Sequence, residues 1–373
     1  MHVRTLWLTD FRSYTSIEVN LSPGLTVLVG ANGEGKTNLL EALAWLATLS
    51  SFRGAPTEAL VRRGAPFAVV RALAEREGRE LLVEAQLQPA GRNRVLVNRQ
   101  PLRRSRDLLG SLRVTVFTPD DLDIVKNGPS ERRRFLDDAL VALHPRNDAL
   151  RADVDRILRQ RNALLRQSGG RLDEAAAFTL DVWDAQLAEA GEALAAARVE
   201  LVEQLRPVLS STYDALARDA ALVTAGYDAA WRGQGLADAL VAARKEDMRR
   251  GVSTVGPHRD DMTLTLAGAP ARTHASQGEQ RTLALSLRLA VHHVVTAATG
   301  SPPVLLLDDV FSELDPERGR ALVAHLPPGQ TVLTTAGGVP SDAHPDVVLR
   351  LRRGAVTAVG TPPDAPPASL PDG

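Results

Sequence analysis

The pattern of hydrophobic and polar positions divides the chain into stretches that predict different elements. Residues 3–29 read as strands and end in the apolar run GLTVLVG, while residues 36–49 carry leucines at helical spacing. This predicts a strand, a glycine-rich loop and a helix in succession. Between about residues 67 and 117 we expect an antiparallel sheet built from four short apolar runs: FAVVRALA, ELLVEAQLQ, RVLVN and RVTVFT.

The strand-like pattern disappears between about residues 129 and 222, where long stretches rich in Ala, Leu and Arg predict helices. The sequence SGG at 168–170 divides them into two helical runs, which suggests a helical hairpin or a short arm. A run of about 30 residues would reach roughly 45 Å. An ordinary helical subdomain fits the same pattern equally well, so both interpretations stay open.

A polar stretch, SQGEQ at 276–280, runs directly into a helix-like segment. That segment has the spacing of a buried helix face, with apolar residues at Leu283, Leu287, Ala290, Val291 and Val294. The polar stretch therefore lies at a helix N-terminus, where free N–H groups and the helix dipole attract an anion.

Two further apolar runs follow this helix. PPVLLLDDVFSELD predicts a buried strand that ends in acids, and QTVLTTAGG predicts another core strand. The last residues, GTPPDAPPASLPDG, are rich in proline and almost uncharged, so we expect a loose tail.

Composition narrows the class of protein. A chain of 373 residues with 44% hydrophobic content can bury one large core or two modest ones, which favours a multi-lobed protein. The absence of cysteine excludes disulfides, thiol chemistry and cysteine-ligated zinc, and we expect a cytoplasmic protein. The N-terminus lacks the apolar core of a signal peptide, and no stretch approaches 18 uncharged apolar residues, so no membrane span is predicted.

The charge is nearly balanced at −1, so any contact with nucleic acid must come from a local patch. Residues 91–113 hold seven arginines against one acid, Asp107. We take Arg103, Arg104 and Arg106 of this segment as candidate DNA contacts. A solvated arginine-rich face explains the same composition, and the sequence does not separate the two interpretations.

The clearest chemical motif is GANGEGKT, which fits G-x-x-x-x-G-K-[ST] between a predicted strand and a predicted helix. Its glycines let backbone N–H groups surround phosphates, the Lys36 ammonium meets the β- and γ-phosphates, and the Thr37 hydroxyl can ligate Mg²⁺. The predicted nucleotide-binding residues are Gly30, Ala31, Asn32, Gly33, Glu34, Gly35, Lys36 and Thr37.

The acids that end VLLLDD complete this site in our interpretation. Asp308 would face the metal and Asp309 the attacking water, so Lys36, Asp308 and Asp309 are the predicted catalytic residues, with Thr37 and Asp308 holding Mg²⁺. Many ATPases of this architecture carry Glu at the second position, and the shorter Asp309 side chain predicts slow turnover. Alternatively, the two acids only cap a following helix.

Six segments together resemble the RecF family of bacterial DNA replication and repair proteins: LWLTDFRSY, GLTVLVGANGEGKTNLLEAL, VFTPDDLDIVKNGPSERRRFLD, GPHRDD, SQGEQRTLALSLRLA and LLLDDVFSELD. That family resembles the head of the SMC-type ABC ATPases. The resemblance implies an α/β fold, an ABC-type P-loop ATPase head of mixed sheet plus antiparallel strands, with an inserted helical second lobe.

The resemblance also gives the polar stretch a role. The Ser-x-Gly-x-Gln signature of ABC ATPases caps the γ-phosphate of ATP held on the opposite subunit. The implied signature residues, acting in trans, are Ser276, Gln277, Gly278, Glu279 and Gln280. Asp315 would lie near the subunit seam, and Gln280 and Arg12 near the nucleotide, although Arg12 fits an ion-pair role equally well.

Two features do not follow from the resemblance. Where transporter-type ATPases present a γ-phosphate-sensing His, this chain has Thr334, Thr335 and Ala336, so the sensor is unassigned. His258 and Arg259 of GPHRDD are characteristic of the family, but the sequence supports only a polar turn there.

The resemblance implies a domain order and a function. The ATPase head would comprise residues 1–125 and 251–360, the helical lobe 126–250 and the tail 361–373. The implied function is an ATP- and Mg²⁺-dependent DNA clamp with weak DNA-stimulated ATPase activity, dimerising on ATP at double-stranded DNA and junctions to help load recombinase. The implied partners are RecO- and RecR-type mediators, in recombinational repair, replication restart and the SOS response to DNA damage.

The alternative is the soluble ATPase subunit of an ABC transporter. The separation from Thr37 to Ser276 is about twice that of transporter ATPases, and the sensing His is missing, so this alternative is less favoured. A small-molecule P-loop kinase would have no use for a signature helix.

Overall fold

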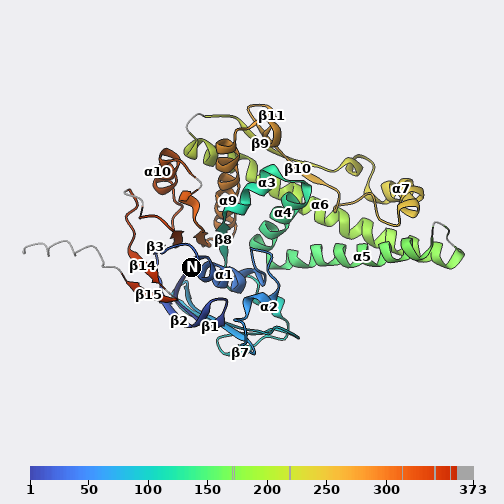
Figure 1. Cartoon of the computed structure of the whole chain (residues 1–373). Coiled ribbons are helices and arrows are strands. Elements are labelled where there is room, and N and C mark those ends of the chain that lie inside the picture. The colour runs from blue at the N-terminus through green and yellow to red at the C-terminus, as the bar shows by residue number, and fades with distance from the viewer. Residues whose placement is uncertain are drawn as a thin grey trace, which may run out of the picture. The chain divides into compact units, whose positions relative to one another are not determined.

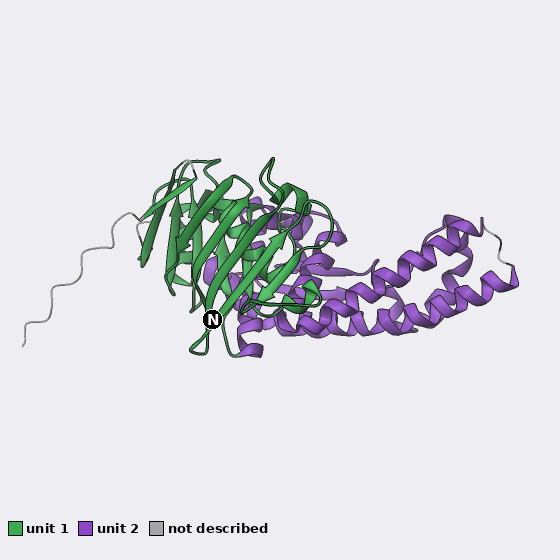
Figure 2. Cartoon of the chain, turned by 90° about the horizontal axis from the view of Figure 1, so that it is seen from below, with its two compact units in different colours: residues 1–119, 300–373 green, residues 120–299 purple. Residues whose placement is uncertain are grey.

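The computed structural model describes residues 1–358 except 170, 172, 218, 219, 313, 340, 341 and 353 (Figure 1). It divides into two compact units (Figure 2). Unit 1 contains residues 1–119 and the chain from residue 300 onward, and unit 2 contains residues 120–299. The predicted tail at 361–373 lies outside the described residues. The predicted head and lobe boundaries, at 125/126 and 250/251, remain a prediction.

Unit 1 contains an antiparallel six-stranded sheet in the order β2-β1-β4-β5-β6-β7. Its strands are β1 (His2–Phe11), β2 (Tyr14–Asn20), β4 (Ala68–Arg76), β5 (Arg79–Leu87), β6 (Arg94–Val97) and β7 (Gln100–Pro101). Buried and exposed positions alternate along much of β2 and β4, because neighbouring side chains point to opposite faces of a sheet. The prediction of an antiparallel sheet is confirmed for the first three of the four runs.

A second six-stranded sheet in unit 1 has the order β15-β14-β3-β13-β12-β8. All neighbours pair in parallel except β14 and β15, so the sheet is mixed. Its strands are β3 (Leu25–Val29), β8 (Val114–Phe117), β12 (Val304–Leu307), β13 (Thr331–Thr335), β14 (Val347–Arg352) and β15 (Ala355–Ala358).

The prediction for the fourth run, RVTVFT, is wrong. Its strand β8 does not join the antiparallel sheet but pairs in parallel with β12, with Val116 opposite Leu306. The apolar pattern identifies a strand, but it carries no information about a partner that lies far along the chain.

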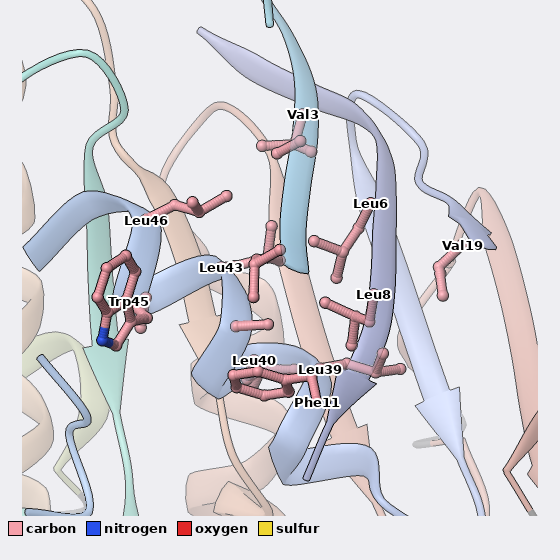
Figure 3. Close-up of a cluster of buried hydrophobic side chains, with 14 of the residues drawn as sticks. Val3, Leu6, Leu8, Phe11, Val19, Leu39, Leu40, Leu43, Trp45 and Leu46 are labelled. Atoms are coloured by element: carbon pink, nitrogen blue, oxygen red, sulfur yellow. The ribbon is translucent and has the colours of Figure 1, made fainter. Parts of the chain in front are cut away.

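Helix α1 (Lys36–Thr48) is almost entirely buried, because it contacts strands of both sheets of unit 1. Leu39, Leu40 and Leu43 pack among side chains of β1 such as Leu6 and Leu8 (Figure 3). Complete burial of each leucine contributes roughly 1.5–3 kcal/mol. This packing fixes the helix that follows the glycine loop. The other helices of unit 1 are α2 (Thr57–Leu60), α10 (Pro316–Ala324) and two 3-10 turns, η1 (Ser105–Leu108) and η5 (Val310–Ser312).

Unit 2 is mainly helical. Its α-helices are α3 (Leu122–Lys126), α4 (Pro129–Leu143), α5 (Asp148–Gln167), α6 (Glu174–Leu216), α7 (Leu236–Arg250), α8 (Ala271–His274) and α9 (Gln277–Thr299). It also has the 3-10 turns η3 (Pro145–Asn147) and η4 (Ala230–Gly233), and η2 (Pro119–Asp121) lies at the boundary. A three-stranded antiparallel sheet has the order β11-β10-β9, formed by β9 (Val223–Asp228), β10 (Asp261–Leu266) and β11 (Ala269–Pro270).

Helices α5 and α6 pack against each other and form the predicted hairpin, and α5 ends at Gln167, directly before the predicted break. The described part of this region nevertheless contains three α-helices, α4, α5 and α6, and not two. Pro145 fixes its own φ and disfavours a helical conformation at the residue before it, so α4 ends at Leu143 and His144 is extended. Helix α6 has 43 residues and is about 65 Å long, and it also contacts α7, α9 and β9 within the unit.

Candidate nucleotide site

The glycine loop connects β3 to α1 and needs glycine at two positions. Gly33 and Gly35 have φ of 86° and 100°, a region that favours glycine. A Cβ atom on Gly35 would also lie 2.6 Å from the Tyr14 hydroxyl, which itself donates a hydrogen bond to the Gly35 carbonyl at 3.0 Å. Tyr14 therefore supports the loop from β2, a contact that the sequence did not indicate.

The Lys36 ammonium lies within the loop and donates to the carbonyl oxygens of Gly30 at 2.5 Å and Ala31 at 3.0 Å. Burial lowers the pKa of Lys36, and the nearby carboxylates of Asp309, Asp308 and Glu34 oppose that shift. When a nucleotide binds, this ammonium can transfer its hydrogen bonds from the two carbonyl oxygens to phosphate oxygens. The negative charge of the phosphates would then compensate the positive charge of Lys36.

Asp308 follows β12 and meets the loop directly. The Thr37 hydroxyl donates to Asp308 Oδ1 at 3.0 Å, and burial raises the pKa of the carboxyl against the hydrogen bonds from Thr334 and Thr37. A hydroxyl and a carboxylate at this distance are hard oxygen ligands of the kind Mg²⁺ takes when phosphates and water complete its shell. The pair fits Mg²⁺, and Thr37 and Asp308 are the residues that would hold it.

Asp309 has φ of 46°, an uncommon conformation outside glycine. Its N–H donates to the Thr334 hydroxyl at 2.9 Å, and that hydroxyl donates to Asp308 Oδ1 at 2.7 Å. Thr334 is fully buried on β13. In the sequence, this threonine is distinguished only by its position, where transporter-type ATPases have a γ-phosphate-sensing histidine.

The alternative reading of the two acids as helix caps is not supported. The next α-helix, α10, is capped by Asp315, whose carboxylate accepts from the N–H groups of Glu317 and Arg318 at 3.1 Å each. Asp315 also pairs with the Arg318 guanidinium at 2.7 Å. Its predicted position near a subunit seam remains a proposal.

The predicted signature residues lie in unit 2 around the start of α9, as the apolar spacing indicated. Ser276 and Glu279 form a reciprocal cap: the Ser276 N–H donates to Glu279 Oε2 at 2.6 Å, and the Glu279 N–H donates to Ser276 Oγ at 3.3 Å. In this arrangement the Ser276 oxygen accepts, so its own proton can still be donated to an anion.

The rest of the signature is anchored to the same unit. The Gln280 side chain is buried and donates to the carbonyl oxygens of Ala271 at 3.2 Å and Arg272 at 3.1 Å, whereas Gln277 is exposed and Gly278 half-buried. These contacts hold the first turn of α9 against α8. They give Gln280 a supporting place in the signature.

The Arg12 side chain forms the ion pair that one of its two interpretations expected. Its guanidinium donates to both carboxylate oxygens of Glu41, at 2.6 and 2.7 Å, and to the Ala59 carbonyl at 3.0 Å. Glu41 is fully buried on α1. This geometry supports a structural role for Arg12.

The GPHRDD segment is a structural junction in unit 2. His258 Nε2 bonds the Ser253 carbonyl at 2.9 Å, and burial lowers the pKa of His258 to about 4, so the ring is neutral at pH 7 and Nε2 carries the proton. Asp260 accepts from the Tyr227 hydroxyl at 2.7 Å and the Trp231 indole at 2.8 Å. Asp261 pairs with Arg132. The segment thus joins α4, β9 and η4.

Buried arginines reinforce this junction, and sequence reasoning missed them. Arg161 is fully buried on α5 and donates to Asp184 on α6 at 2.6 Å, Asp247 on α7 at 2.7 Å and Ser253 at 2.8 Å. Arg198 on α6 makes two bonds to Asp137 on α4, at 2.8 and 2.9 Å. An arginine on an amphipathic helix is normally exposed, so composition alone gave no signal for this network.

The arginine-rich segment lies at the β6 and β7 edge of the antiparallel sheet and in η1. Its exposed members are Arg92, Arg94, Arg99, Arg103, Arg104 and Arg106. The single acid, Asp107, accepts from the Arg104 backbone N–H at 3.2 Å and caps η1. Arg113 is half-buried, and its backbone carbonyl accepts from Val304.

Comparison with known proteins gives a consistent result. Residues 2–332 match the family model described as the RecF/RecN/SMC N terminal domain. The DNA replication and repair protein RecF of Kineococcus radiotolerans is 46% identical over 369 residues, which is 92% of this chain and 94% of the relative. The RecF protein of Streptomyces avermitilis is 44% identical over 351 residues, covering 90% and 93% of the two chains.

Solved structures agree with the sequence comparison. A structure of the recombination mediator protein RecF-ATP in the RecFOR pathway has a TM-score of 0.87 and 27% identity, covering 96% of this chain and 98% of that one. An Smc head domain from Pyrococcus furiosus has a TM-score of 0.57 at 18% identity, covering 96% of both chains. The predicted fold class, an ABC-type ATPase head with an inserted helical lobe, is confirmed.

Proposed function

We propose that this chain, which belongs to the RecF family, is an ATP-dependent DNA-binding clamp of recombinational repair and replication restart. Two subunits bind two ATP molecules, dimerise on double-stranded DNA or at junctions with single strands, and separate after hydrolysis. The observation that carries this proposal is the convergence of Lys36, Thr37, Asp308 and Asp309 at the carboxyl ends of the parallel strands β3 and β12 of one mixed sheet. DNA as the substrate is consistent with a cytoplasmic protein.

ATP binding is the first element of the proposal. The residues 30–37 loop supplies backbone N–H groups, Lys36 supplies a charge already inside the loop, and the Thr37 and Asp308 pair supplies ligands for Mg²⁺. A bound Mg²⁺ would neutralise charge on the β- and γ-phosphates. The solved RecF-ATP structure of a relative supports the choice of ATP.

Hydrolysis is the second element. Asp309 would orient the attacking water, with Lys36 and Asp308 setting the phosphates and metal. An aspartate reaches less far than the glutamate of related ATPases, so we expect a weak ATPase, stimulated by DNA, that works as a conformational switch.

Dimerisation completes the site in this proposal. Residues 276–280 of one subunit cap the γ-phosphate held by the other, with the Ser276 hydroxyl donating its proton to a phosphate oxygen. The capping geometry supports this role, because the Ser276 hydroxyl oxygen accepts from the Glu279 N–H and its own proton can therefore be donated to an anion. Asp315 would lie near the seam.

DNA contact is assigned to the exposed arginines of η1 and its approach, Arg103, Arg104 and Arg106. Guanidinium groups bind phosphates without reading sequence, which suits a protein that acts at gaps and junctions. RecO- and RecR-type mediators are the partners we propose, since relatives of this chain act in a RecFOR pathway. The transporter-subunit alternative is not favoured, because the described relatives are DNA repair proteins.

ATP-dependent dimerisation on DNA is the test. Sedimentation of the parent protein with a gapped duplex and Mg²⁺ should show a dimer with ATP and a monomer with ADP. Lys36→Ala should stay monomeric because the loop loses its contact to the β- and γ-phosphates, while Lys245→Ala, at an exposed lysine on α7, should behave like the parent. A dimer that forms equally with ADP, or in Lys36→Ala, would contradict the proposal.

A further inference from the structure

Thr334 lies between the two elements that make the nucleotide site. Strand β13 has β3, which leads into the phosphate loop, on one side and β12, which leads into the acids, on the other. Thr334 is opposite Leu28 of β3, and its side chain is fully buried. No motif in the sequence assigns this residue a role.

The polarity of the Thr334 hydrogen bonds is determined by its partners. The Asp309 backbone N–H can only donate, so the Thr334 oxygen accepts from it at 2.9 Å. The hydroxyl proton is then free to go to Asp308 Oδ1 at 2.7 Å. The Thr37 hydroxyl donates to the same carboxylate oxygen at 3.0 Å.

These contacts orient two acids with different proposed tasks. Asp308 is held toward Thr37 by two hydroxyls that both meet Oδ1. Asp309 is held with φ of 46°, a conformation that an aspartate does not favour without support. The Thr334 hydroxyl oxygen, which accepts from the Asp309 N–H, and the Ser312 hydroxyl, which donates to the Asp309 carbonyl at 2.8 Å, supply that support on both sides of the residue.

We propose that Thr334 is a positioning residue for ATP hydrolysis. Its single hydroxyl bonds both the metal-facing Asp308 and the water-facing Asp309, and so fixes the positions of the two acids relative to each other. The inference rests on the proposed function, because it assigns a task to both acids. Because Thr334 is fully buried, it bonds the two acids and does not reach the nucleotide, unlike a sensing histidine, which contacts the γ-phosphate. In this proposal the hydrogen bonds from the buried Thr334 hydroxyl fix Asp308 and Asp309, and no histidine is needed to position these acids.

The test compares three variants. Thr334→Val removes the hydroxyl and keeps the shape, Thr334→Ser keeps the hydroxyl, and Thr335→Val removes a buried hydroxyl of the same strand that accepts from the Gly337 N–H instead. The measurements are ATP affinity by calorimetry, kcat with saturating ATP, and the Mg²⁺ concentration that gives half of kcat.

We expect Thr334→Val to bind ATP within about threefold of the parent, while kcat falls roughly tenfold or more and the Mg²⁺ requirement rises, as loss of a hydrogen bond to a charged group predicts. Thr334→Ser should keep at least about half of kcat, and Thr335→Val should match the parent. If Thr334→Val does not fold, Thr334→Cys, whose thiol is a weak donor, must show the same loss of kcat.

Parental kcat in a folded Thr334→Val protein would overturn this inference and leave the proposed function standing. Equal losses in Thr334→Val and Thr334→Ser would also overturn it, because the shape and not the hydroxyl would then matter. A parent protein that binds ATP but never hydrolyses it would instead contradict the proposed function, and the inference with it.

Discussion

Thr37 Oγ1 donates a hydrogen bond to Asp308 Oδ1 across 3.0 Å, although the two residues lie 271 positions apart in the chain. The sheet order explains the contact. Strands β3 and β12 flank β13 and all three run parallel, so their carboxyl ends lie at one edge of the sheet. The strand order alone therefore brings the loop after β3 next to the acids after β12.

Asp309→Asn should trap the ATP-bound dimer. Asparagine adopts positive φ as readily as aspartate, so the backbone at 46° is retained and only the group beside the water changes. ATP and Mg²⁺ binding should stay within about twofold, while kcat falls roughly a hundredfold or more. Dissociation from gapped DNA, followed in real time, should slow. Turnover of ATP at the parental rate would remove Asp309 from its proposed role.

Replacing Arg103, Arg104 and Arg106 together by Gln should weaken DNA binding and reduce the slope of log affinity against log salt by up to about three. The η1 contact from Asp107 should survive, because its carboxylate accepts from the Arg104 backbone N–H, which Gln also has. A matched triple variant at Arg156, Arg206 and Arg249, exposed arginines that each pair with an acid of their own helix, should leave the slope unchanged. Equal salt slopes in the two triple variants would show that the arginines of residues 91–113 form a solvated surface and do not contact DNA.

Arg161→Met should destabilise the protein by about 3–5 kcal/mol, because Asp247 would remain buried without its arginine partner, whereas Asp184 keeps its pair with Arg244. Urea unfolding followed by circular dichroism measures this loss. Arg156→Met, on the same helix but half exposed in a surface pair, should cost at most about 1 kcal/mol. Similar losses in the two variants would show that the network contributes little.

Buried histidines should make unit 2 sensitive to acid. His292 on α9 is buried, and neither of its ring nitrogens has a hydrogen-bond partner among the described residues. Burial lowers the pKa of His292 to about 4, and that of His258 likewise. A histidine whose folded pKa is below its unfolded value takes up its proton more readily when unfolded, so stability should fall as the pH drops from about 6.5 to 4.

His292→Leu tests this directly. The variant loses one titrating group and no hydrogen bond within the described residues, so its denaturation midpoint should depend less on pH between 7 and 5 than that of the parent. The part of the pH dependence of the denaturation midpoint that comes from His258 should remain in the variant. Identical pH profiles for the variant and the parent would contradict the account.

The sequence predicted the parts of the site that lie in short contiguous motifs. The loop at residues 30–37 and the acids at 308 and 309 have spacing that only a few backbone geometries satisfy, and the helix start near 276–277 follows from apolar spacing. Contacts that depend on remote partners were not predictable. Strand β8 looked like its neighbours in sequence but pairs with β12.

The buried polar groups were missed for a related reason. Arg161 looks like any arginine of a helical surface until α6 and α7 bring their carboxylates to it. Thr334 looks like any residue of a core strand until the acids beside it are placed. In both cases the role comes from neighbours that local pattern does not specify.

Complementation between two inactive proteins tests the central claim that each ATP site is built from two subunits. Lys36→Ala lacks a working loop, and Ser276→Arg places a bulky side chain where the γ-phosphate would be capped, so each should be inactive alone. In a mixed dimer both lesions fall in one site and the other stays intact. With random pairing and independent sites, an equal mixture should recover about a quarter of the parental ATPase activity. A mixture that stays inactive, although both proteins are folded and mixed dimers of the two form with ATP, would contradict the account.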